Sequence, residues 1–205
     1  MSFTSVVPTQ NSVNRLRFVI ISTLLIFLSG FSISAGQEVG FTEVGFTEDA
    51  PKAIQQAIAE NKDVILLFTG SDWCPPCKKL EKEVLAEKEF LDEISKQYVL
   101  IKLDFPKNSP QDPKLAEQNA GYSKKYGIDS FPTLVLADSK LVPFAFAGYE
   151  AGGHLNYLDL LQTARKLRIN RDAKLAAAKA ETGEARARLL DEAISEMRQE
   201  IIGVY

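Results

Sequence analysis

Short apolar runs in the middle of the chain predict four β-strands. DVILLF at residues 63–68 and YVLIKLDF at 98–105 are nearly continuous apolar runs, which is typical of strands buried on both faces. TLVLA at 133–137 and LVPFAFAG at 141–148 are separated only by Asp-Ser-Lys, so they predict a β-hairpin. Pro143 lacks a backbone N–H, which places the second hairpin strand at an edge of the sheet.

Amphipathic segments with helical spacing surround these strands. The first helix is expected to begin near Pro51 and to end at Asn61, with one apolar face made by Ala53, Ile54, Ala57 and Ile58. Further helices are expected at residues 75–96, 114–126 and 153–169. The tail, 170–205, has two helical stretches at 172–181 and 184–202, which predict a helical hairpin packed on the domain before it.

The N-terminal segment differs in kind from the rest of the chain. Residues 1–17 are polar and carry only two charges, both arginines, and they precede an apolar run at 18–33 and small residues. This order is typical of a secretory signal, and the run is shorter than the ~20 apolar residues of a membrane-spanning helix. We therefore expect a signal peptide at 1–35, with a retained membrane anchor as the alternative.

A duplicated pentapeptide follows this expected signal. EVGFT occurs twice in succession within residues 36–47, which we interpret as a linker or an edge strand, because a repeat this short does not build a repeat fold. The chain has 205 residues, of which 45% are hydrophobic, and a net charge of −3. This composition predicts one globular domain with room for a small appendage, and it argues against a nucleic-acid-binding protein, which is normally basic.

Both cysteines of the chain, Cys74 and Cys77, lie in the stretch DWCPPC. A zinc site needs four ligands, and the chain offers only these two thiols and a distant His154, so no metal site is expected. A disulfide across so short a loop would stabilise the fold by only about 2 kcal/mol, although a structural role stays open. A redox pair explains the spacing better. A helix that starts at Pro75 would place Cys74 at its N-terminus, where the thiolate is favoured, and Cys77 one turn further.

The motif WCPPCK resembles the active-site motif of the thioredoxin superfamily. VLIKLD at 99–104 and KKYGIDSFPTLVLADSK at 124–140 are similar to the family's central strand and to its turn and hairpin, and the resemblance covers about 48–169. It implies an α/β thioredoxin fold, with a central mixed sheet flanked by helices, here followed by a C-terminal helical extension. Exported bacterial thioredoxin-like proteins are the most similar group.

The resemblance also implies roles for individual residues. Cys74 would be the nucleophile and Cys77 the resolving thiol. Pro132 matches the family's cis-proline, beside which an extended substrate peptide would pair with the backbone. The expected substrate contacts are Trp73, Pro75, Pro76, Phe131, Pro132 and Thr133.

One position departs from the family. Thioredoxins carry a buried aspartate six residues before the first cysteine, and this chain has Phe68 there. Lys102 matches the lysine that neighbours that aspartate. We hypothesise that Glu81, which follows Cys77 by one helical turn, replaces the aspartate as the proton acceptor, with a pKa raised by burial.

These features predict an exported thiol–disulfide oxidoreductase, periplasmic or secreted. We expect a monomer without a cofactor that reduces protein disulfides, receives electrons from an unidentified donor and meets the membrane only through its N-terminal segment. An oxidase stays open, and an isomerase is disfavoured. A rival interpretation is a peptide-binding module whose cysteines stay oxidised. A Cu(I) chaperone is the weakest interpretation, because no Met or His cluster supports it.

Overall fold

Four strands form one mixed sheet in the order β2-β1-β3-β4. Strands β1 (Asp63–Thr69) and β2 (Tyr98–Asp104) are parallel, whereas β3 (Thr133–Ala137) runs antiparallel to β1, and β4 (Pro143–Ala147) runs antiparallel to β3. The computed structural model describes residues 45–202, with side chains to residue 196. The expected signal at 1–35 lies outside the described residues.

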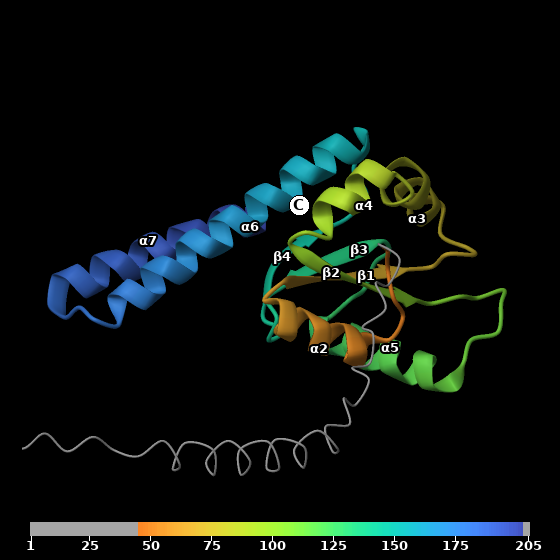
Figure 1. Cartoon of the computed structure of the whole chain (residues 1–205), viewed down its shortest axis with the longest axis horizontal. Coiled ribbons are helices and arrows are strands. Elements are labelled where there is room, and N and C mark those ends of the chain that lie inside the picture. The colour runs from red at the N-terminus through yellow and green to blue at the C-terminus, as the bar shows by residue number, and fades with distance from the viewer. Residues whose placement is uncertain (1–44, 203–205) are drawn as a thin grey trace, which may run out of the picture. The chain divides into compact units, whose positions relative to one another are not determined.

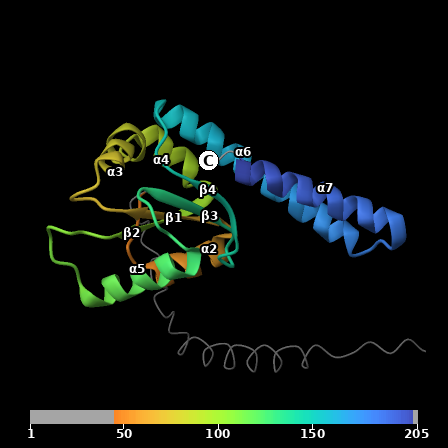
Figure 2. The same cartoon turned by 180° about the vertical axis from the view of Figure 1, so that it is seen from behind.

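Helices cover both faces of the sheet (Figure 1, Figure 2). On one face lie α2 (Ala50–Glu60) and α5 (Pro113–Tyr126), and on the other lie α3 (Pro75–Leu80), α4 (Lys88–Ile94) and the first part of α6 (Gly153–Ala178). Strand β1 is buried along its whole length and supplies alternate residues to the two cores. This burial explains its continuous apolar sequence. The expected mixed sheet flanked by helices is confirmed.

The single helix expected at 75–96 is wrong, because the structure divides it into three pieces. Helix α3 runs directly into a π-helix, η1 (Glu81–Leu85), and α4 begins after a break at Ala86–Glu87. The wider π-turn allows two successive residues, Val84 and Leu85, to be buried in the same core. Ile58 also departs from expectation, since its side chain is 53% exposed and not on the buried face of α2.

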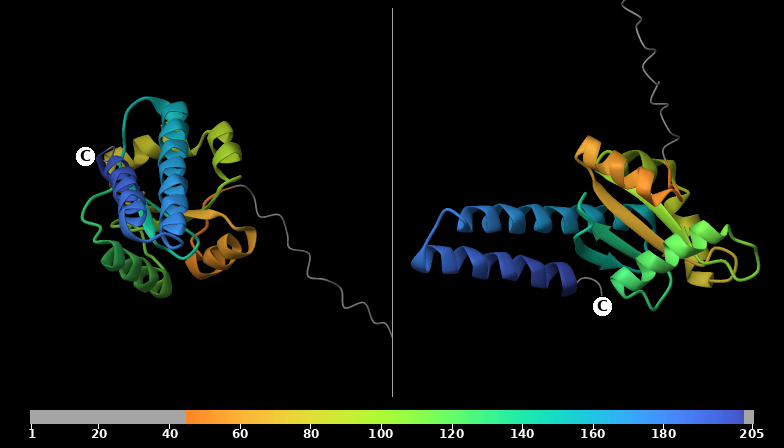
Figure 3. Two further views of the ribbon diagram at one scale, coloured as in Figure 1. Left: turned by 90° about the vertical axis from the view of Figure 1, so that its left-hand side faces the viewer. Right: turned by 90° about the horizontal axis from the view of Figure 1, so that it is seen from below.

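The C-terminal helices form an antiparallel hairpin (Figure 3). Helix α6 does not end at 169 as expected but continues to Ala178, and α7 (Gly183–Ile202) returns beside it. The small side chains of Ala178 and Ala193 are buried, as close packing between the two helices requires. Within residues 45–202, no helix is long and apolar enough to cross a membrane.

Two contacts join peripheral segments to the sheet. Asp63, at the start of β1, accepts hydrogen bonds from Arg165 Nε at 2.9 Å and Arg168 Nη2 at 2.5 Å, both on α6. Thr47, in the second copy of the pentapeptide, forms a parallel bridge with Ile101 of β2. The described end of that repeat therefore lies alongside β2, at the edge of the sheet.

Candidate active site

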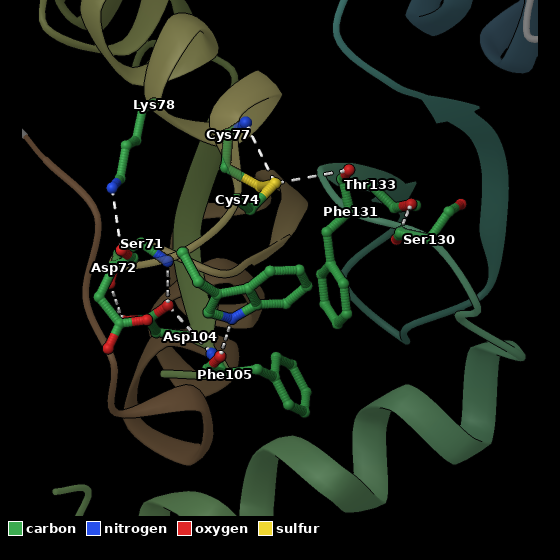
Figure 4. The surroundings of a disulfide bond; sticks show 11 residues. Ser71, Asp72, Cys74, Cys77, Lys78, Asp104, Phe105, Ser130, Phe131 and Thr133 are labelled. Carbon is green, nitrogen blue, oxygen red and sulfur yellow. Dashed lines mark hydrogen bonds between the residues drawn. A yellow bond between two sulfur atoms is a disulfide. The ribbon is translucent and has the colours of Figure 1, made fainter. Parts of the chain in front are cut away.

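A disulfide joins Cys74 and Cys77 where α3 begins (Figure 4). Strand β1 ends at Thr69, and residues 70–73 form a turn that leads into the helix. Cys74 is the N-cap of α3, and Pro75 and Pro76 occupy its first two positions. Proline fits there because those backbone positions need no N–H within the helix.

The helix start favours negative charge on Cys74. The backbone N–H of Cys77 donates to Cys74 Sγ across 3.3 Å. After reduction, the same N–H and the helix dipole would stabilise a Cys74 thiolate. Each cysteine is only 3% exposed, so little of either residue is open to an incoming thiol.

Aromatic rings and a cation surround the disulfide on one side. The ring of Trp73 meets Phe131 edge-on with 5.8 Å between centroids, and its Nε1 donates to the Phe105 carbonyl oxygen at 2.8 Å. Lys107 Nζ lies 3.6 Å from the centroid of the Trp73 ring. A side chain at Gly70 would collide with Trp73, since a Cβ there would lie 2.5 Å from Cε2. Glycine at this position therefore allows the ring to lie against the turn.

Two carboxylates hold this turn against the loop after β2. Asp104 accepts from the backbone N–H of Ser71 at 2.9 Å and also from the Ser71 hydroxyl. Asp72 accepts from the backbone N–H groups of Lys107 at 3.0 Å and Asn108 at 2.7 Å. The sequence analysis did not predict these hydrogen bonds. The available signals were the position of Asp72 beside the cysteine motif and the three prolines of the loop, which indicate a loop of fixed shape.

We expect acidification to release the loop that Asp72 holds. The hydrogen bond from the Lys107 backbone lowers the pKa of Asp72 below its ordinary value. This contribution to stability is therefore complete above the ordinary aspartate pKa of about 3.9 and is lost as the pH falls through the lowered pKa. Trp73 fluorescence should change in this acidic range. In Asp72→Asn, the signal should already be shifted at pH 7 and should depend less on pH. Identical titrations would contradict the role of Asp72.

The expected substrate wall lies opposite Cys74. The peptide bond between Phe131 and Pro132 is cis, and Pro132 is buried. Cys74 Sγ lies 3.6 Å from the Phe131 carbonyl oxygen, and the Thr133 hydroxyl donates to the Ser130 carbonyl oxygen at 2.9 Å. The structure thus brings Trp73, Phe131, Pro132 and Thr133 together around the disulfide, while Pro75 and Pro76 are exposed on the helix start. Their roles in substrate binding stay predictions.

Glu81 and Lys102 lie near Cys77, whereas Phe68 does not join them. A pocket of ≈370 Å³ is lined by residues that include Cys77, Glu81 and Lys102. Glu81 is exposed, so the burial that the hypothesis invoked to raise its pKa is not observed. Phe68 is fully buried on the other side of β1, against Phe105 and Tyr126. It supplies packing where the family has a proton acceptor.

The distant histidine has a different neighbour. His154 Nε2, near the start of α6, lies 3.5 Å from a carboxylate oxygen of Glu89. Among the described residues, no group of three or more His, Cys, Asp and Glu side chains could hold a metal ion.

Comparisons with known proteins give a consistent result. The family model for a thioredoxin-like domain matches residues 50–158. A protein named disulfide bond reductase DsbH, from Chlamydia pneumoniae, is 31% identical over 121 residues, which is 59% of this chain and 73% of that protein. The thioredoxin-related protein DsbJ of the same organism is 27% identical over 139 residues, 66% of this chain but only 40% of that longer protein.

A solved structure supports the same relationship. The structure titled DsbH oxidoreductase is 27% identical, covers 68% of this chain and 96% of its own, and superposes with a TM-score of 0.58. The similarity therefore extends from the sequence to the arrangement of the elements that carry the disulfide.

Proposed function

Because the chain belongs to the thioredoxin-like family, we propose that it uses Cys74 and Cys77 as a redox pair to reduce disulfides in proteins outside the cytoplasm. A thioredoxin-like thiol–disulfide oxidoreductase activity follows from the family and from the paired cysteines. The observation that carries the proposal is the disulfide at the N-terminus of α3, facing the Phe131–Pro132 wall.

The geometry supports a two-step exchange. In the reduced protein, the Cys74 thiolate attacks one sulfur of the substrate disulfide, forming a mixed disulfide and releasing the other substrate sulfur as a thiolate. Cys77 then loses its proton and attacks Cys74 Sγ, which breaks the mixed disulfide and releases the second substrate sulfur. Two electrons pass to the substrate, its two thiolates take up protons, and the protein is left with the observed disulfide. A dithiol donor must reduce it again.

Two observations favour reduction as the direction. One relative is named a disulfide bond reductase. The residues between the cysteines are Pro75 and Pro76. A strong oxidant needs a charge or a histidine there to stabilise its reduced form, and these two prolines supply neither. Export is supported by the apolar run at 18–33.

Turnover of a protein disulfide tests this function. The full chain, cycled by a small dithiol, should release thiols from a disulfide-bonded protein well above the rate of the dithiol alone. The Cys74→Ser, Cys77→Ser double variant should give only the background rate. Equal rates for the two proteins would overturn the proposal and favour a binding module with cysteines that stay oxidised.

Glu81 is proposed to accept the proton of Cys77 during the second step. It is the one carboxylate in the pocket that Cys77 lines, and Lys102 in the same pocket would stabilise the charges that form. Glu81→Gln should slow resolution of the mixed disulfide about a hundredfold near neutral pH. Much of this loss should be recovered at alkaline pH, where hydroxide replaces the carboxylate. Stopped-flow Trp73 fluorescence measures this step, and an unchanged rate and pH profile would remove Glu81 from the mechanism.

A further inference from the structure

The pocket beside Cys77 contains more lysines than the exchange reaction explains. It lies where α3 and η1 meet the turn after β1 and the β2 strand, and its lining residues are Ser71, Cys77, Lys78, Glu81, Lys82 and Lys102. Its volume, ≈370 Å³, is large enough for a side chain to enter. The pocket reaches Cys77, and its lining residues do not include Phe131 or Pro132 of the expected substrate wall.

Positive charge predominates in this pocket. Three of its lining residues are lysines, and only one, Glu81, is a carboxylate. Lys78 Nζ donates to the Asp72 carbonyl oxygen at 2.9 Å, and the Ser71 hydroxyl is bound to Asp104. In the part of the chain that the structure describes, neither Lys82 nor Lys102 makes an ion pair. Two ammonium groups therefore remain available to an incoming anion.

We propose that this pocket is a subsite for a carboxylate that the redox partner carries near its own cysteine, an inference that rests on the proposed function. A partner in disulfide exchange is a cysteine-containing protein or a small thiol peptide, and both carry their negative charge as carboxylates. A side chain in this pocket would lie beside Cys77 while the partner disulfide occupies Cys74. Lys82 and Lys102 bind the carboxylate, and the negative charge of Glu81 repels ligands that carry more than one negative charge.

The subsite has a kinetic signature that separates it from proton transfer. A carboxylate bound by exposed lysines raises the association rate and lowers KM, and salt screens both effects. Proton transfer from Cys77 changes kcat for every substrate alike. The size expected for a partly exposed ion pair is a two- to fivefold change, about what single surface pairs contribute.

The test compares disulfide peptides that differ in one charge. In a set of peptides, a single Glu is moved through the three positions on each side of the reacting cysteine, and each peptide is paired with its Gln counterpart. We expect at least one Glu peptide to show a kcat/KM about two- to fivefold higher than its Gln partner, through KM, at low salt. Lys82→Gln should abolish that preference. Lys52→Gln, on α2 at the opposite face of the sheet, should preserve it.

The outcomes distinguish the inference from the function beneath it. If only the disulfide of a γ-glutamyl tripeptide responds to Lys82→Gln, the carboxylate belongs to a small thiol and the subsite stands. If every Glu and Gln pair reacts equally and Lys82→Gln changes nothing, the subsite is overturned while the oxidoreductase survives. If no disulfide is reduced at all, the proposed function itself fails, and the subsite with it.

Discussion

Cys77→Ser is expected to stop turnover and to trap the substrate on Cys74. The mixed disulfide forms as in the unchanged protein, but serine cannot attack it, so the substrate leaves only when an external thiol arrives. Since Cys77 is held in the same helical turn, removing this intramolecular attack should cost at least about a thousandfold in turnover. A gel-shifted adduct that disappears on treatment with dithiothreitol is the measurement.

The serine variant at the other cysteine provides the control. Cys74→Ser should form no adduct, because it removes the sulfur at the helix N-cap, which lies 3.6 Å from the Phe131 carbonyl oxygen on the expected substrate wall. Turnover of Cys77→Ser at the rate of the unchanged protein would contradict a two-cysteine cycle. An adduct that forms equally well in Cys74→Ser would exchange the assigned roles.

Asp63→Ala is expected to lower the stability of the fold strongly. The Asp63 side chain is only 7% exposed and accepts hydrogen bonds from Arg165 and Arg168 of α6. Its removal leaves two guanidinium groups without their shared partner beside the start of β1. Breaking a buried ion pair in this way typically costs about 3–5 kcal/mol. Urea unfolding of the oxidised protein should show this loss of unfolding free energy.

The matched control removes a more exposed carboxylate that pairs with one of the same arginines. Asp172 also contacts Arg168, but its side chain is 43% exposed, so Asp172→Ala should cost about 1 kcal/mol or less. If both variants lose the same unfolding free energy, the ion pairs of Asp63 are no more important for stability than an exposed ion pair. Only the large loss for Asp63 supports the conclusion that α6 is anchored to the sheet by this carboxylate.

The strands could be predicted from the sequence, because a buried strand needs a short run of apolar residues that is easily recognised. The run at 63–68 is apolar at every position after Asp63, as the structure requires of a central strand. The break in the helix after Leu80 could not be predicted, because it depends on how Val84 and Leu85 meet the core. The junction at 169–172 was misjudged for a similar reason. The charged residues around it look like a boundary, yet two of them, Arg168 and Asp172, form an ion pair along a continuous helix.

The sulfur chemistry of the site was predictable, whereas its support was not. Cys74 and Cys77 are neighbours in sequence, so their spacing alone indicates a pair at a helix start. Asp72 binds a loop more than thirty residues further along the chain, and Lys107 reaches Trp73 from that loop. Such contacts are set by tertiary structure and leave no local pattern. The predicted burial of Glu81 was wrong, because helical spacing indicates on which face of a helix a residue lies and not how deeply its side chain is buried.

The reduction potential of the Cys74–Cys77 pair tests the reductase function most directly. The full chain is equilibrated in thiol buffers of graded potential and followed by the fluorescence of Trp73, its only tryptophan, beside the disulfide. We predict one two-electron transition at about −230 mV or below, as expected of a reductase. A transition between about −120 and −180 mV would contradict the reductive direction, and a disulfide that does not cycle would contradict a redox function altogether.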